Sequence, residues 1–116
     1  MMPGFVEIAR ADFRDGEMRK FLVDGKEVLI ARVGANYYAT QDRCQHLGGD
    51  LSMGKLEGTI VTCPRHHSQY DLKDGHVVRW TDWSGFKLAL AKLAKSPRPL
   101  RTYALKIEAD KILVSL

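Results

Sequence analysis

Two short stretches of the chain each combine a cysteine with a histidine. The first is Cys44–His46 (CQH) and the second is Cys63–His66 (CPRH), and sixteen residues separate His46 from Cys63. A thiolate is a soft metal ligand and an imidazole a borderline one, so each stretch offers two groups that bind transition metals. Both stretches lie next to predicted strands and contain or adjoin glycine or proline, which is typical of loops. Two loops of one sheet could therefore bring four ligands to one metal centre.

Two other interpretations of these residues compete with that one. In the first, both cysteines are buried thiols and the histidines lie on the surface. A histidine two or three positions after each of the chain's two cysteines argues against this. In the second, the four residues bind structural zinc, which also accepts two Cys and two His. Zinc fingers keep the cysteine pair and the histidine pair in separate stretches, whereas each stretch here is mixed.

The order C-x-H, sixteen residues, C-P-x-H resembles the motif of the Rieske iron–sulfur family. The resemblance covers most of the chain, including the Asp74-Gly75 turn and a run at Pro99–Tyr103 before the last strands. It implies a Rieske-type 2Fe–2S cluster, one per chain. His67 also follows the second stretch, but the family spacing selects His66. The resemblance assigns one iron to the two cysteines and the other to the two histidines, with Cys44, His46, Cys63 and His66 as the ligands.

The same resemblance bears on the reduction potential. Two imidazoles in place of two thiolates remove two negative charges, so the centre is easier to reduce, and family potentials span about −150 to +300 mV. Ser68 and Tyr70 stand where high-potential members of respiratory complexes place hydroxyl donors to the cluster sulfurs. Such donors stabilise the reduced form. We therefore predict a potential above the bottom of the family range, falling as pH rises because a ligand imidazole can lose its proton.

The rest of the chain has the pattern of short strands separated by turns. Asp24-Gly25 and Asp74-Gly75 are two-residue hairpin signals. The short, regular spacing predicts an all-β fold, a small antiparallel sandwich or barrel of the Rieske type. We expect a single domain over residues 1–116, with cluster-binding loops at about 43–50 and 63–70. The predicted strands are Phe5–Ile8, Met18–Val23, Val28–Val33, Tyr37–Thr40, Thr59–Thr62, Tyr70–Leu72, His76–Val78, Tyr103–Glu108 and Lys111–Val114.

One segment departs from the β pattern. Ser84-Gly85 is followed by FKLALAKLAK, which predicts an inserted short amphipathic helix near residues 84–95 that ends before Ser96-Pro97. Three lysines fall opposite the apolar face of this helix. They form either a solvated face or a docking surface for an acidic partner. These residues are Lys87, Lys92 and Lys95.

Composition narrows the class of protein further. The chain has 116 residues, of which 45% are hydrophobic and 28% charged, as in a single globular domain. Its net charge of +4 comes from one segment, because residues 79–101 carry six basic residues against one acidic residue. This pattern lacks the aromatic interleaving of a nucleic-acid surface. No apolar run is long enough for a membrane helix, and no secretory signal opens the chain, so we expect a cytoplasmic protein.

The resemblance to the Rieske family implies an electron carrier rather than an enzyme. We expect a soluble one-electron carrier that passes electrons from a reductase to an acceptor enzyme, with an oxygenase as one candidate. The chain has no room for the second iron site that the full Rieske oxygenases carry. The alternatives are a Rieske-like small subunit of a larger redox enzyme, as in nitrite reductase, a zinc-stabilised interaction module, and a redox sensor.

Overall fold

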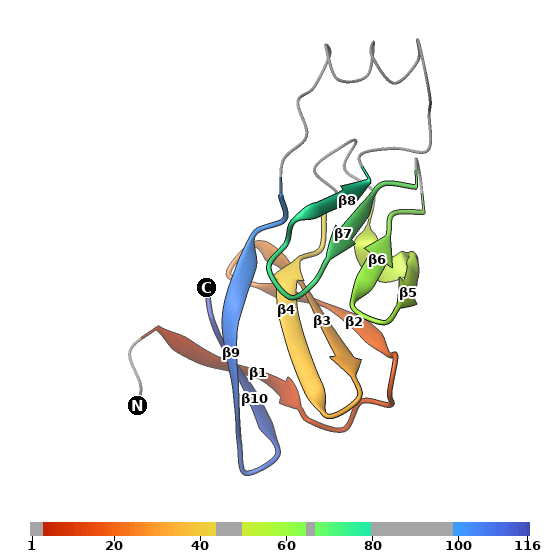
Figure 1. Cartoon of the computed structure of the whole chain (residues 1–116). Helices are drawn as coiled ribbons and strands as arrows, with labels where there is room; N and C mark the ends of the chain where they lie inside the picture. The colour runs from red at the N-terminus through yellow and green to blue at the C-terminus, as the bar shows by residue number, and fades with distance from the viewer. Residues whose placement is uncertain (1–3, 44–49, 65–66, 80–98) are drawn as a thin grey trace, which may run out of the picture.

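The computed structural model describes residues 4–43, 50–64, 67–79 and 99–116. These residues form ten short strands in two sheets and a single turn of 3-10 helix (Figure 1). In chain order the elements are β1 (Phe5–Arg10), β2 (Met18–Val23), β3 (Lys26–Val33), β4 (Asn36–Gln41), η1 (Leu51–Met53), β5 (Lys55–Glu57), β6 (Ile60–Thr62), β7 (Gln69–Asp71), β8 (Val77–Arg79), β9 (Thr102–Glu108) and β10 (Lys111–Ser115).

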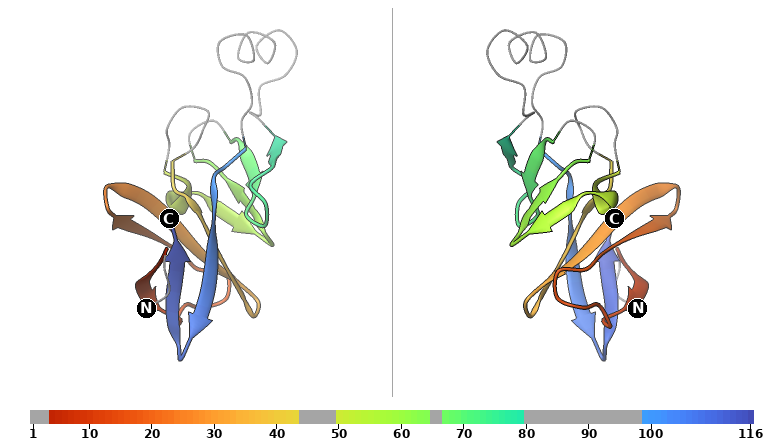
Figure 2. Two further views of the ribbon diagram at one scale, coloured as in Figure 1. Left: turned by 90° about the vertical axis from the view of Figure 1, so that its left-hand side faces the viewer. Right: turned by 90° about the vertical axis from the view of Figure 1, so that its right-hand side faces the viewer.

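The larger sheet has the strand order β1-β10-β9-β4-β3-β2, and the smaller has the order β5-β6-β7-β8. Every pairing in both sheets is antiparallel. The larger sheet curls, and the smaller sheet lies against one of its ends (Figure 2). This arrangement confirms the predicted all-β antiparallel fold. The two predicted ligand loops both lead into or out of the smaller sheet.

Strand β3 lies at the centre of the packing and is buried on both faces. All four residues of Val28–Ala31 are fully buried. Because side chains alternate along a strand, Val28 and Ile30 pack into one cluster and Leu29 and Ala31 into the other. Fully burying an aliphatic side chain of this size stabilises the fold by about 1.5–3 kcal/mol. The buried members of the first cluster are Val28, Ile30, Phe13, Ala39, Ile112 and Val114, and those of the second are Leu29, Ala31, Leu51, Val61, Cys63, Tyr70, Leu72 and Leu100.

The Asp24-Gly25 hairpin forms as predicted between β2 and β3. Both residues have positive φ, 50° and 77° respectively. A two-residue turn of this kind follows the natural twist of the flanking strands, and aspartate and glycine tolerate the left-handed backbone best. The turn sets the register that pairs Val23 with Lys26.

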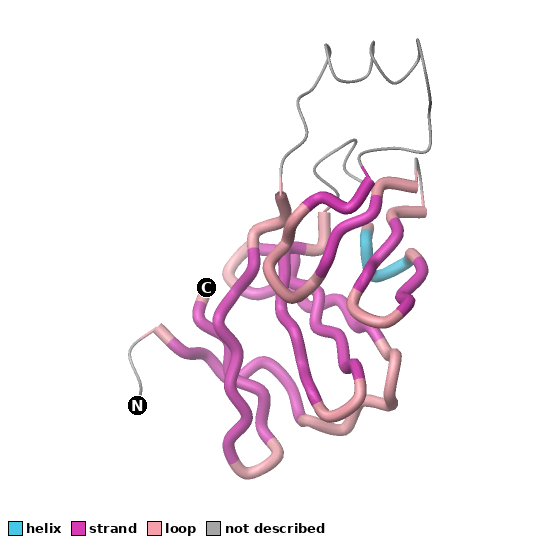
Figure 3. Tube along the Cα trace, in the orientation of Figure 1, coloured by secondary structure: helices cyan, strands magenta, loops and turns pink. Residues whose placement is uncertain are grey.

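Some predicted boundaries were wrong. Strand β7 ends at Asp71, one residue earlier than expected, because the Asp71 carbonyl and carboxylate accept the N–H groups of Gly75 and Lys73 and so begin the turn. Neither β5 nor η1 was expected. Within the described part of the chain, η1 is the one helical element (Figure 3). The amphipathic helix predicted near residues 84–95, with its lysines, lies outside the described residues. No helix in the described ranges has the length and apolar character needed to span a bilayer.

Candidate metal centre

The two ends of the first ligand loop are held together at its base. Arg43 and Asp50 form an isolated antiparallel bridge that brackets residues 44–49. The backbone carbonyl of Asp42 accepts the N–H of Leu51 at 2.7 Å. The Asp42 carboxylate accepts the N–H of Ser52 at 2.7 Å and its hydroxyl at 2.9 Å. Cys44 and His46 lie outside the described residues, but the chain that carries them starts and ends at this clamp.

The Asp42 carboxylate is buried and surrounded by polar groups. Its side chain is fully buried, and burial raises the pKa of Asp42, while the two hydrogen bonds from Ser52 oppose that shift. The Lys20 ammonium lies 3.9 Å from this carboxylate, 3.1 Å from Glu27 and 3.4 Å from Asp50. The hydrogen bond to Glu27 raises the pKa of Lys20. A cation thus lies among three carboxylates at the base of the loop and offsets their mutual repulsion.

The second ligand loop is a closed hairpin between β6 and β7. The N–H of Cys63 donates to the carbonyl of Ser68 at 2.8 Å, and the N–H of His67 donates to the carbonyl of Cys63 at 3.1 Å. The Arg79 guanidinium, on β8, donates to the carbonyl of His67 at 3.0 and 3.2 Å. These bonds fix the loop backbone around Cys63, whose side chain is 1% exposed. His66 lies outside the described residues.

His67, the histidine that the family spacing does not select, lies at the surface. Its backbone has a positive φ of 59°, and the residue is exposed to solvent. Cys63, by contrast, is buried, although it also lines a shallow depression of ≈ 370 Å³ together with Met53, Pro64 and His67. A centre bound at Cys63 would therefore lie close beneath the protein surface.

Ser68 and Tyr70, the two expected hydroxyl donors, are both fully buried. Tyr70 belongs to the same apolar cluster as Cys63. Buried hydroxyl groups need hydrogen-bond partners, so their burial beside the loop is compatible with donation to a metal centre. Their role as donors stays a prediction.

A glycine joins the two loop regions. Gly54 follows η1 and packs against the backbone of β6 just before Cys63. A Cβ at this position would lie 1.9 Å from the carbonyl oxygen of Thr62, so the close approach requires glycine. The segment that closes the first loop is thereby held directly against the strand that begins the second.

A similar contact places the segment that precedes β9. The N–H of Leu100 donates to the carbonyl of Gly75 at 2.7 Å. A Cβ on Gly75 would lie 2.2 Å from the Leu100 carbonyl, and the positive φ of Gly75, 81°, also favours glycine. The β7–β8 turn therefore holds the segment that leads into β9 against the smaller sheet (Figure 1).

Several of these positioning residues are absent from the expectations drawn from sequence. They are Lys20, Asp42, Ser52, Gly54 and Arg79. The position of Asp42, two residues before Cys44, is the one signal that could have drawn attention to it. A bond between residues on either side of an irregular loop leaves no periodic pattern in the sequence.

Comparison with known proteins identifies the class. The model of the family described as Rieske [2Fe-2S] domain matches residues 5–98. The chain belongs to this family. Membership implies a 2Fe–2S cluster, and the donor chemistry fits, since two thiolates and two imidazoles are the ligands of a Rieske centre and Cys63 is buried in a closed hairpin.

The chain is similar to ferredoxin components of dioxygenase systems. It is 33% identical over 105 residues to the ferredoxin component of biphenyl 2,3-dioxygenase from Rhodococcus jostii (strain RHA1), covering 90% of this chain and 85% of the relative. It is 28% identical over 109 residues to the ferredoxin component of the naphthalene 1,2-dioxygenase system from Pseudomonas putida, covering 94% and 91%. The solved ferredoxin of carbazole 1,9a-dioxygenase from Nocardioides aromaticivorans IC177 has a TM-score of 0.78 at 26% identity and covers 96% of each chain.

A further solved structure with a similar fold is a complex of a ferredoxin with its oxygenase. It is described as the complex of reduced oxygenase and oxidized ferredoxin in carbazole 1,9a-dioxygenase, and its matching chain has a TM-score of 0.76. The identity of 23% makes this a likeness of fold. In that system the ferredoxin forms a complex with its oxygenase.

Proposed function

We propose that this chain is an electron carrier of an oxygenase system, accepting electrons from a reductase and passing them singly to the oxygenase. The observation that carries the proposal is the match to ferredoxin components over nearly the full length of both chains. With the biphenyl dioxygenase component the match covers 90% of this chain and 85% of the relative. Those relatives are electron-carrying components, separate from the catalytic oxygenase. The order of cysteine and histidine residues supports the same function.

The proposed ligands are Cys44 and Cys63 on one iron and His46 and His66 on the other, in one cluster per chain. When bound, the cluster supplies a reversible one-electron couple. The C-P-x-H spacing of the family supports His66, rather than the neighbouring His67, as the fourth ligand.

The described residues act by holding this site in place. Asp42 and Ser52 close the first loop, the Cys63–Ser68 and Arg79 bonds close the second, and Gly54 joins the two. A site that moves little on a change of charge loses little energy to reorganisation when an electron arrives. The hydrogen bonds at the described ends of the two loops are suited to limiting such movement.

The test is an EPR-monitored redox titration of protein purified without oxygen, with iron, sulfide and zinc measured on the same sample. We expect about two irons per chain and one rhombic signal in the reduced form. His66→Ala should remove that signal, while His67→Ala, the matched control, should keep it. A colourless, zinc-containing protein would overturn the proposal in favour of a zinc-stabilised module.

A second test addresses the acceptor. Reduced protein is mixed with the oxygenase component of the Rhodococcus biphenyl dioxygenase, and reoxidation is followed by absorbance. Co-purification with a large redox enzyme of its own would instead favour the accessory-subunit alternative. We further propose a single domain over residues 1–116 and a cytoplasmic location, checked by limited proteolysis and by cell fractionation.

A further inference from the structure

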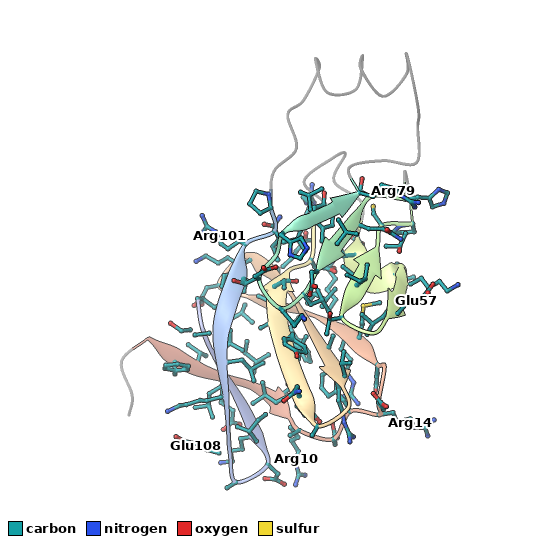
Figure 4. The ribbon with its side chains drawn as sticks, in the orientation of Figure 1. Arg10, Arg14, Glu57, Arg79, Arg101 and Glu108 are labelled. Atoms are coloured by element: carbon teal, nitrogen blue, oxygen red, sulfur yellow. The ribbon has the colours of Figure 1, made fainter. Side chains whose placement is uncertain are left out.

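A basic groove lies between the β2–β3 turn and the start of β9. Its volume is ≈ 640 Å³. We call it the basic groove; its main lining residues are Leu22, Lys26, Glu27, Gln41, Arg43 and Arg101. Figure 4 shows Arg101 at the start of β9, at the same end of the molecule as Arg79 and opposite Arg10 and Arg14. Arg43 directly precedes Cys44, so the basic groove adjoins the first ligand loop.

Gln41 builds one wall of the basic groove by joining two distant segments. Its backbone N–H donates to the carbonyl of Arg101 at 2.9 Å, and its side-chain oxygen accepts the N–H of Arg101 at 2.7 Å. Its side-chain nitrogen donates to the carbonyl of Arg43 at 2.7 Å. Both arginines are therefore fixed through their backbones. Replacing the side chain of Arg101 leaves all of these hydrogen bonds in place.

The positive charge of the basic groove is only partly compensated. Glu27 is the one carboxylate among its described lining residues, and it is shared between Lys20 at 3.1 Å and Arg43 at 3.4 Å. Lys26 and Arg101 form no salt bridge with any residue that the structure describes. A guanidinium with open donors binds a carboxylate through two parallel hydrogen bonds. The groove therefore has charge available for an acidic group.

An apolar side chain borders the same groove. Leu22, on β2, is 73% exposed, the second most exposed large apolar residue among those described. Arginine is enriched at protein interfaces, where apolar contacts add affinity and charged groups fix the orientation of the partner. The pairing fits a protein segment better than a small inorganic anion.

We propose that the basic groove binds an acidic segment of the protein that exchanges electrons with this chain, with a carboxylate on Arg101 and an apolar residue against Leu22. The inference rests on the proposed function and names the surface that serves it. A partner held there would lie beside the first ligand loop. Attraction between opposite charges would also speed the encounter and make it depend on salt.

The first experiment uses small electron acceptors of opposite charge and needs no protein partner. Dithionite-reduced full-length protein is oxidised by hexacyanoferrate(III), an anion, or by hexaamminecobalt(III), a cation, in a stopped-flow instrument. Each acceptor takes one electron from the reduced protein. Arg101→Glu should slow oxidation by the anion roughly three- to tenfold at low salt and should not slow oxidation by the cation. Arg14→Glu, the same charge change at the far end, should leave both rates within about twofold of wild type.

The second experiment tests for the acidic segment itself. The peptide acetyl-Glu-Leu-Asp-Leu-Glu-amide is added to the hexacyanoferrate(III) reaction, and its counterpart with Gln and Asn in place of the acids serves as the control. The acidic peptide should slow the oxidation of wild type by hexacyanoferrate(III) and leave the oxidation rate of Arg101→Glu unchanged. Equal effects of the two peptides, or equal slowing of both acceptors by Arg101→Glu, would overturn the proposal.

The oxygenase reaction described above separates this inference from the proposed function. Wild type that never reduces the oxygenase, at any salt concentration, counts against the function, whereas the small acceptors and the peptides still decide the groove. If wild type and Arg101→Glu reduce the oxygenase equally fast, the proposed role of the basic groove is overturned while the proposed function stands.

Discussion

Asp42 and Ser52 face each other across the base of the first ligand loop, where one buried carboxylate accepts both the N–H and the hydroxyl of the same serine, at 2.7 and 2.9 Å. The pair joins the residue after β4 to the middle of η1. The proposed ligands Cys44 and His46 lie between them in the chain. Their positions therefore depend on a bond that neither of them makes.

Loss of the Asp42 carboxylate should weaken the loop. Asp42→Ala leaves the N–H of the half-buried Ser52 without its acceptor, which costs about 1–3 kcal/mol. Asp42→Asn keeps the shape and one acceptor oxygen, so it should cost less. Thermal unfolding followed by circular dichroism, with iron content measured before heating, checks both variants. Wild-type behaviour of Asp42→Ala would show that the clamp does not hold the loop.

Gly54→Ala should be among the most harmful single substitutions. The added Cβ would lie 1.9 Å from the Thr62 carbonyl and 3.1 Å from that of Leu51, and both are backbone groups that cannot move aside cheaply. We expect a loss above about 4 kcal/mol or failure to retain iron. Gly58→Ala is the control, because open space surrounds that glycine and the cost is that of its positive φ, about 1 kcal/mol. Similar unfolding midpoints for the two variants would contradict the expectation.

Ser68→Ala and Tyr70→Phe should each lower the reduction potential. Both side chains are fully buried, and a hydroxyl that donates to the centre favours the more negative reduced state. A net hydrogen-bond contribution of about 1 kcal/mol corresponds to roughly 40 mV for a one-electron couple. The EPR-monitored titration measures it, with Tyr103→Phe, a half-buried tyrosine of β9, as the control. Unchanged potentials in both variants would assign the two hydroxyls to packing alone.

Stability at acid pH should depend in part on Glu17. The Nε of Arg19 donates to its carboxylate at 2.7 Å and the N–H of Arg14 at 2.8 Å, and the hydrogen bond to Arg19 is the main reason that the pKa of Glu17 is lowered from 4.5. A lowered folded-state pKa contributes stability above the unfolded value and loses it as pH falls through the folded value. Urea denaturation between about pH 6 and about pH 3 should therefore show a smaller decline for Glu17→Gln than for wild type. Parallel curves would show that the ion pair contributes nothing.

The amino-acid sequence determined the features that depend on neighbouring residues. The hairpin at Asp24-Gly25 follows from the φ values that these two residues tolerate. The side chains of β3 alternate between the two buried clusters because a strand repeats every two residues. The sequence also predicted the antiparallel class of the fold. The mixed spacing of cysteine and histidine is likewise a local property, and it pointed to the family that the comparison confirmed.

The tertiary structure alone decided how the site is supported. Gly54 lies against Thr62 of the neighbouring strand β6, Arg79 donates to the loop carbonyl of His67, and Gln41 joins β4 to the segment before β9. Each contact joins segments separated by a turn or by a long stretch of chain. Such contacts form only after the sheets have packed, because sequence periodicity specifies which face of a strand is buried but not which distant backbone lies against it.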